Sequence, residues 1–190
     1  MRRHHPDSTR GFTMVELMVT LAVLAILLAM AVPSFRDFAE RSALRGAADN
    51  VIGVIAVARE DAVKRDSLVR VDFKAVGTGF CVGTIPVASV TAAGCDCSVS
   101  GTTCTVAFPA NAGELRSVNL IGSPDFGGDM AFVIDPKTGM LATLTDTGSI
   151  EMTVPRGYGL GVQVNAMGRA SLCAPADTTV MPGPSTGACP

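Results

Sequence analysis

The chain has 190 residues, of which 48% are hydrophobic and 17% are charged, and its formal net charge at pH 7 is −2. Residues 67–190 hold six Lys and Arg against nine Asp and Glu, which gives this part a net charge of −3. Such a balance is not that of a strong nucleic-acid binder, and it excludes a broad basic surface for anionic lipid.

The N-terminal segment has a cationic start and a long apolar run. Residues 1–11 carry three arginines and one aspartate, and the nineteen residues Leu17–Phe35 carry no charge. As a helix this run is about 28 Å long and just spans a hydrocarbon core of about 30 Å. The arginines favour a cytoplasmic N-terminus. A secretory signal peptide cleaved near residues 29–31 is the rival interpretation, but signal peptides have a shorter apolar core.

Two residues of this segment are unusual for an ordinary membrane anchor. Glu16 stands at the start of the apolar run, although a charge at the centre of a membrane helix costs roughly 2.5 to 3.5 kcal/mol, and less near its edge. Pro33 removes one helical hydrogen bond, which predicts either a bend or the end of the membrane helix.

After Pro33 the helical period continues over residues 36–66. Its apolar positions recur at spacings of seven, four, three and four, which places them on one face of a helix. The sequence therefore predicts one long helix from about residue 13 to about residue 64, bent or loosened near Pro33. The apolar positions are Leu44, Val51, Ile55, Ala58 and Ala62.

From residue 67 onward the period changes to two, which is typical of strands with one buried face. Residues 130–144 predict a hairpin about the turn Asp135–Gly139. Residues 86–103 predict a loop, and the tail 174–190 is ordered only if Cys189 is tied down. A long helix followed by antiparallel strands is an α+β arrangement. Strands are predicted at 69–73, 80–85, 104–108, 115–121, 130–134, 140–144, 149–154, 160–165 and 169–173.

All six cysteines lie beyond the apolar segment, which places them in an oxidising compartment if the N-terminus is cytoplasmic. Six cysteines allow fifteen complete pairings, and the sequence alone does not choose among them. Their spacing favours one disulfide between Cys173 and Cys189 and two among the others. A zinc site from those four is the alternative, but the Cys-x-Cys spacing is tighter than zinc sites use. The four are Cys81, Cys95, Cys97 and Cys104.

No catalytic arrangement is evident, and the sequence predicts neither an enzyme nor a cofactor or metal site. Both histidines, His4 and His5, lie within residues 1–11. Three aspartates in a glycine-rich stretch carry the kind of oxygen ligands that calcium prefers, although a solvated loop is the simpler interpretation. Three glycines around Tyr158 lack the spacing of a phosphate-binding loop. These residues are Asp125, Asp129 and Asp135, and Gly157, Gly159 and Gly161.

The N-terminal segment resembles that of a type IV prepilin. The residues that carry the resemblance are Gly11-Phe12-Thr13-Met14-Val15-Glu16 and the uncharged run after them. The resemblance implies cleavage between Gly11 and Phe12 by a prepilin peptidase and N-methylation of Phe12. It also implies that Glu16 meets the N-terminal amine of a neighbouring subunit in a filament, and that Pro33 disturbs the helix.

The C-terminal half is similar to the GspH/FimT group of pseudopilins and minor pilins. The similar residues are Phe132, Gly139, and the stretches 149–154 and 162–169. The implied fold is pilin-like, with a long N-terminal helix packed on an antiparallel β-sheet domain. The implied organisation is a leader at 1–11, a transmembrane helix at 12–35, an amphipathic helix at 36–66, a periplasmic β-rich domain at 67–173 and a disulfide-tied tail at 174–190.

Three functions follow from these resemblances. The first is a minor pilin in the tip or initiation complex of a type IV pilus; the second is a GspH-type pseudopilin of a type II secretion system. The expected partners are other pilins, the peptidase and the bacterial inner membrane. The third is a minor pilin that binds DNA through Arg169, with Arg156 nearby. Some relatives carry a second arginine where this chain has Ser171, which argues against DNA binding.

Overall fold

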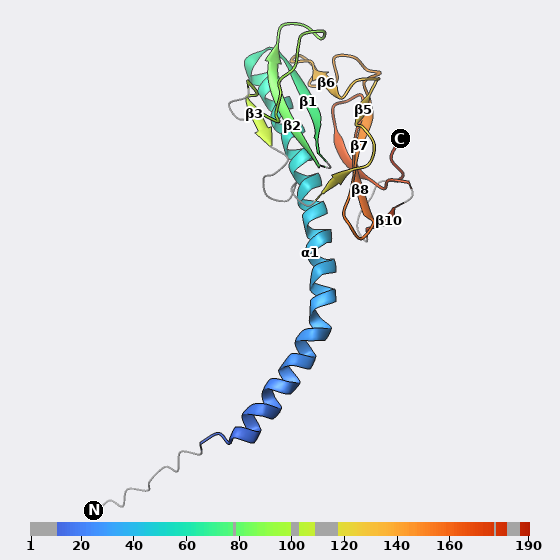
Figure 1. Cartoon of the computed structure of the whole chain (residues 1–190). Helices are drawn as coiled ribbons and strands as arrows, with labels where there is room; N and C mark the ends of the chain where they lie inside the picture. Colours follow the sequence, from blue (N-terminus) through green and yellow to red (C-terminus); the bar gives the residue numbers. More distant parts are fainter. Residues whose placement is uncertain (1–10, 78, 100–102, 109–117, 177, 182–186) are drawn as a thin grey trace, which may run out of the picture. The chain divides into compact units, whose positions relative to one another are not determined.

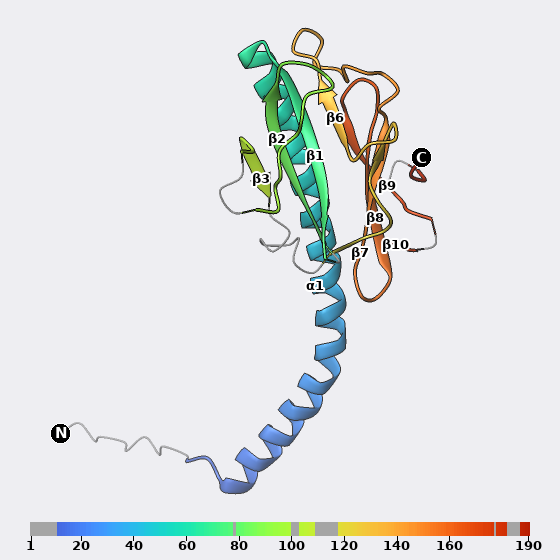
Figure 2. The same ribbon diagram turned by 45° about the horizontal axis from the view of Figure 1, so that its top comes forward.

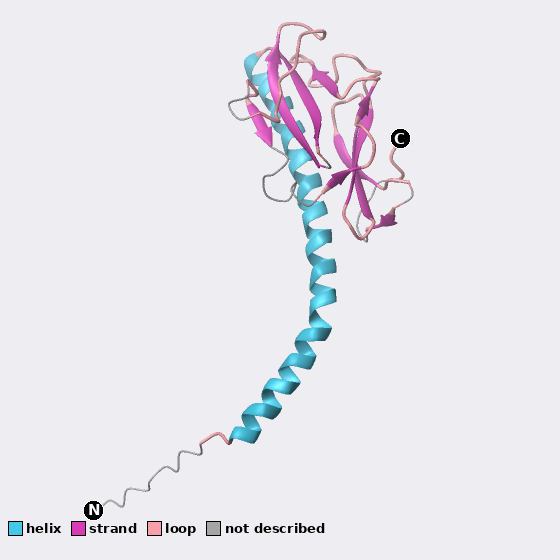
Figure 3. Cartoon of the chain, in the orientation of Figure 1, coloured by secondary structure: helices cyan, strands magenta, loops and turns pink. Residues whose placement is uncertain are grey.

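The computed structural model describes residues 11–77, 79–99, 103–108, 118–176, 178–181 and 187–190. The chain divides into two compact units, residues 1–38 and 39–190. Within the described residues, one helix, α1 (Met14–Arg65), is followed by ten strands (Figure 1; Figure 3). This confirms the predicted α+β arrangement and the single long helix, which continues through Pro33.

The second half of α1 forms one wall of the core of residues 39–190. Its predicted apolar face is buried, and Leu44, Val51 and Ala58 are fully inaccessible. The helix ends at Arg65, where Asp66 takes a positive φ of 48° and turns the chain into the first strand. Because few residues other than glycine, asparagine and aspartate adopt this conformation readily, Asp66 suits the end of a helix.

The first sheet has the strand order β3-β2-β1-β6, and all its pairs are antiparallel. Strand β1 alternates as the sequence predicts, with Val69, Val71 and Phe73 buried. Figure 2 shows β1 and β2 beside the helix that they cover. The strands are β1 (Leu68–Val76), β2 (Gly79–Val87), β3 (Val106–Phe108) and β6 (Ala131–Ile134).

The second sheet has the order β10-β8-β7-β4, with β5 paired to β7 and β9 paired to β8. Its pairs are antiparallel except for β10, which lies parallel to β8. The strands are β4 (Asn119–Leu120), β5 (Asp125–Phe126), β7 (Gly148–Thr153), β8 (Tyr158–Val164), β9 (Ala170–Cys173) and β10 (Thr179–Val180).

Both sheets and the helix share one hydrophobic core. At its centre Phe73 stacks on Phe126 with ring centroids 5.3 Å apart, and Phe126 meets Phe132 edge-on at 5.0 Å. These rings join β1 and β6 of the first sheet to β5 of the second. Aromatic contacts of this kind add about 0.5 to 1.5 kcal/mol beyond their buried area.

Three disulfides join Cys81 to Cys97, Cys95 to Cys104, and Cys173 to Cys189. None of the six cysteines is free, so this structure leaves no thiolate for a zinc ion. The first disulfide ties the loop after β2 to that strand, and the second joins two points within the loop. The third holds the C-terminal tail against β8, where a Cβ atom built on Gly161 would lie 2.4 Å from the Cys189 sulfur.

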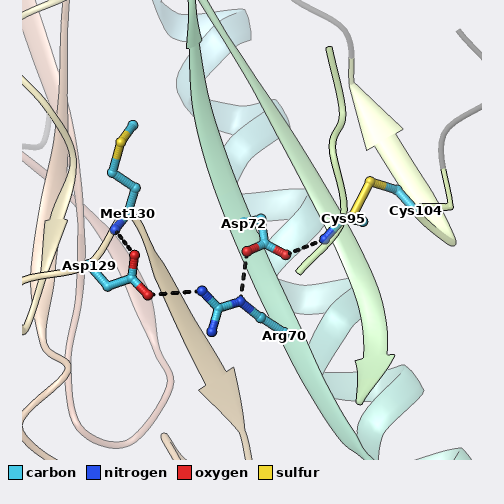
Figure 4. A network of polar contacts seen from close by, with 6 residues as sticks. All are labelled: Arg70, Asp72, Cys95, Cys104, Asp129 and Met130. Atoms are coloured by element: carbon cyan, nitrogen blue, oxygen red, sulfur yellow. Dashed lines mark hydrogen bonds and ion pairs between the residues drawn. A yellow bond between two sulfur atoms is a disulfide. The ribbon is translucent and has the colours of Figure 1, made fainter. Parts of the chain in front are cut away.

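A polar network fixes the disulfide-bonded loop to β1 (Figure 4). Asp72 accepts hydrogen bonds from Arg70 Nε at 2.7 Å and from the Cys95 backbone N–H at 3.0 Å. Arg70 Nη2 also donates to Asp129 at 2.9 Å, which links β1 to the segment before β6. Burial lowers the pKa of Arg70, but its hydrogen bonds to Asp72 and Asp129 outweigh burial and raise the pKa above its usual value.

The structure contains the predicted turn at residues 135–139 but only a short part of the predicted hairpin at residues 130–144. Residues 140–144 form no strand; they touch β6 through a single bridge between Ile134 and Leu141. The turn itself is closed by hydrogen bonds from Asp135 N–H to the Met140 carbonyl and from Ala142 N–H to the Val133 carbonyl, while the other edge of β6 pairs with β1. Of the predicted strand 115–121, residues 115–117 lie outside the described residues, and only Asn119–Leu120 forms a strand. The tail, expected to be ordered only if Cys189 is held, carries the Cys173–Cys189 disulfide and contributes β10.

Candidate functional site: the first turns of helix α1

The first turn of α1 begins at a threonine cap. Residues Gly11–Thr13 are not helical, and the helix starts at Met14. Thr13 Oγ1 accepts a hydrogen bond from the Glu16 backbone N–H at 3.2 Å, and the Thr13 carbonyl accepts one from Leu17 N–H at 3.1 Å. This satisfies one backbone donor that a helix start otherwise leaves unpaired.

The sequence signal that could have predicted this cap is Thr-x-x-Glu. Glu16 stands at the third helical position, where a carboxylate also interacts favourably with the positive end of the helix dipole. The cap thus fixes where the helix begins, two residues after the predicted cleavage bond between Gly11 and Phe12.

The Glu16 carboxylate is exposed, and within the described residues it makes no ion pair. Its neighbours on the helix are apolar and equally open. Phe12 is 76% exposed, Met14 82% and Leu17 54%. Residues 11–31 are exposed on every side of the helix, so nothing described in this chain covers them.

Helix α1 is the one helix among the described residues that is long and apolar enough to cross a membrane. Its most apolar 18-residue window has a mean hydropathy of 2.6, and none of that window is buried. A core helix of a soluble protein would be mostly buried, so the exposure of this window argues against that alternative. Length and composition alone do not separate a membrane anchor from a signal sequence.

The two arginines considered for DNA binding have different surroundings. Arg156 lies in the turn between β7 and β8, where its guanidinium is 3.7 Å from Glu40 Oε1. Beside it, Arg41 lies over the Tyr158 ring at 4.5 Å and donates to its hydroxyl at 2.7 Å. Arg156 is therefore already part of the contact between the helix and the second sheet, which weakens the case for a phosphate contact.

Arg169 lies in the turn between β8 and β9, on the side where α1 ends. Gly168, with a φ of 68°, brings this turn so close to the segment after β6 that a Cβ atom there would lie 2.8 Å from the Gly139 carbonyl oxygen. Gly139, with a φ of 63°, in turn lies against the Arg59 side chain. The structure thus brings Arg59, which no sequence motif singles out, to the same surface groove as Arg169.

The three aspartates considered for calcium do not gather. Asp129 pairs with Arg70, and Asp125 accepts the Gly128 backbone N–H at 2.7 Å. Asp135 caps its own turn, and the backbone N–H groups of Thr138 and Lys137 lower the pKa of its carboxyl. Among the described residues no group of three His, Cys, Asp or Glu could hold a metal ion.

The comparisons with known proteins agree on the N-terminal segment. Residues 7–32 match the family model of the prokaryotic N-terminal methylation motif. The chain is similar to prepilin peptidase-dependent protein D of Escherichia coli (strain K12), with 42% identity over 38 residues. That match covers 20% of this chain and 26% of the relative, so the two share only about a quarter of the relative's length.

The structure is also similar to the crystal structure of the type IV minor pilin FimU of Pseudomonas aeruginosa (strain PAO1). The TM-score is 0.48 at 16% identity, over 71% of this chain and 91% of that one. A likeness of this size carries no argument about function. The motif and the N-terminal match establish the coarser conclusion: the chain is a type IV pilin-like protein with a prepilin-processing motif at its N-terminus.

Proposed function

We propose that the chain is a minor pilin, a structural subunit that is cut between Gly11 and Phe12, methylated on Phe12 and assembled into a type IV pilus. The observation that carries this proposal is the exposed, uncharged first half of α1 with a single carboxylate, Glu16, in its first turn. Such a surface is stable only in a membrane or against other apolar helices. The inner membrane before assembly and a bundle of pilin helices afterwards supply these two environments.

Glu16 is the residue on which assembly rests in this proposal. In a dry helix bundle its carboxylate needs a positive partner, and the new N-terminal amine of Phe12 on a neighbouring subunit supplies one. Removing one member of a buried ion pair costs about 3 to 5 kcal/mol, because the other charge is left without a partner. The effect therefore appears only in the filament, since Glu16 is exposed in the single chain.

The test is a Glu16→Ala variant in cells that otherwise lack the chain. We expect cleavage at Gly11 to continue and the amount in sheared filaments to fall at least tenfold. Asp49→Ala is the matched control, because Asp49 is an exposed carboxylate of the same helix that lies away from its first turn. Wild-type incorporation of the Glu16→Ala variant would refute the proposed role of Glu16.

Deleting the chain separates this proposal from the secretion pseudopilin. The minor-pilin proposal expects lost twitching motility with normal type II secretion. The reverse pattern would make the chain a GspH-type pseudopilin. Intact motility with reduced DNA uptake would instead favour a DNA-binding pilin.

A further inference from the structure

A groove of about 600 Å³ runs beside the last turns of α1, between the helix and the turn that joins β8 to β9. Its floor is apolar and includes Ile52, Ala56 and Val63, of which Val63 is 56% exposed. Arg59 and Arg169 line the same groove, one from the helix and one from the turn. The groove therefore joins an uncovered apolar strip to two guanidinium groups.

These two guanidinium groups are not neutralised by the part of the chain that the structure describes. Lys64, also at the groove, pairs with Glu60 four residues earlier, which leaves Arg59 and Arg169 without a carboxylate. Arginine binds carboxylates through two parallel hydrogen bonds, and an apolar floor favours a ligand that also carries apolar groups. A protein surface with exposed carboxylates meets both conditions. Nucleic acid fits less well, because it offers phosphates but little for the apolar floor.

A complementary surface lies on the other face of the second sheet of the same chain. It is a polar hollow of about 630 Å³ lined by Asp125 and Glu151, with glycine-rich backbone on its rim. Ile150 and Met152 of β7 are buried in the core, so Glu151 between them faces away from the helix. Asp125 is exposed on the rim. The acidic hollow and the basic groove thus face different directions.

We propose that the groove of one copy binds the rim of the acidic hollow of a second copy, with Arg59 and Arg169 facing Asp125 and Glu151. The inference rests on the proposed function as a filament subunit. Because the two surfaces differ, the contact is head-to-tail, and repeated head-to-tail contacts build open helical assemblies rather than closed dimers. Opposite charges set the register of the contact, and the apolar floor becomes buried.

The test is photo-crosslinking of the full-length chain in cells that express two differently tagged copies. Val63→p-benzoylphenylalanine places the probe at the groove in one copy, and mass spectrometry maps the attachment point in the other. We expect a crosslink between the two tags within or beside the segments 121–128 and 147–151. Arg169→Glu in the probe-bearing copy should lower its yield at least tenfold, and Glu151→Arg in the second copy should restore it. Lys74→Gln removes a positive charge on the first sheet without placing a second carboxylate beside Asp96; it is the control and should leave the yield unchanged.

The inference is overturned if the probe labels only another protein or nucleic acid, if it labels a second copy at other segments, or if it labels nothing. It is also overturned if Glu151→Arg fails to restore the yield while both variants keep their three disulfides on a non-reducing gel. Normal assembly into filaments without the crosslink would refute this contact and leave the proposed function intact. The mapped crosslink in membranes of cells whose filaments never contain the chain would support the contact and refute the proposed function.

Discussion

Removing the Asp72 carboxylate should loosen the disulfide-bonded loop from β1 and destabilise residues 39–190. Asp72 is only 14% exposed and makes two contacts that nothing else replaces, one to Arg70 at 2.7 Å and one to the Cys95 N–H at 3.0 Å. A Cβ atom built on Gly94 would overlap the Asp72 carboxylate, so the loop lies directly on this side chain. The Asp72→Ala variant deletes both contacts and leaves a space beneath the loop.

The expected loss is about 3 kcal/mol. Stranding a buried charge costs about 3 to 5 kcal/mol, but Arg70, 16% exposed, keeps its bond to Asp129, so the lower end applies. Leaving the Cys95 N–H without its acceptor costs about 1 to 3 kcal/mol by itself, so about 3 kcal/mol is the lower end for the loss of both contacts. For a domain of this size, 3 kcal/mol corresponds to a Tm lower by about 6 to 12 °C.

Scanning calorimetry of the detergent-solubilised chain measures this shift. Asp129→Ala is the control, because Asp129 is 64% exposed and its loss leaves the Arg70–Asp72 pair intact. An exposed pair contributes about 0 to 1 kcal/mol, so the control should lose no more than about 4 °C. A decrease in Tm of less than 2 °C for Asp72→Ala would refute the conclusion that the burial of Asp72 makes its contacts strong. Equal decreases in Tm for the two variants would refute it as well.

Three further predictions concern other parts of the chain. Gly161→Ala should cost about 1 to 3 kcal/mol of unfolding free energy, because its methyl group would meet both sulfurs of the Cys173–Cys189 disulfide, and an unchanged Tm would contradict this. Hydrogen bonds from Lys74 and Ser98 lower the pKa of Asp96 to about 2, so its stabilising effect is full above the usual value near 3.8 and is lost as the pH falls toward 2. The Tm difference between wild type and Asp96→Asn should shrink over that window, and a constant difference would contradict it. Disulfide mapping after proteolysis should find Cys81 bound to Cys97 and Cys95 to Cys104, and any exchange of partners would contradict the structure.

The long helix and the alternation of β1 were predictable because each depends on a local period. The apolar face that includes Leu44 and Val51 is at helical spacing, and Val69, Val71 and Phe73 alternate. The site at the first turn was predictable for a different reason. A lone glutamate before an uncharged run is rare enough to be informative without any tertiary structure.

Neither the short extent of the hairpin nor the groove was predictable, because each depends on contacts between distant residues. Residues 140–144 alternate enough to predict a strand, but only Leu141 makes a bridge to β6, and its N–H donates to the carbonyl of Ala166 in the turn after β8. Arg59 and Arg169 are 110 positions apart, and only the close approach of Gly139 and Gly168 brings them to one groove. No local periodicity in the sequence indicates that these two glycines lie close together.

The central claim is that this chain is processed as a prepilin, and the mass of the mature protein tests it most directly. The chain is purified from membranes of cells that contain the peptidase, and intact mass and N-terminal peptides are measured by mass spectrometry. The account predicts the loss of residues 1–11, an N-terminus at Phe12 and the added mass of one methyl group. Retention of residues 1–11, or an N-terminus near residue 31 as a signal peptidase would leave, would contradict it.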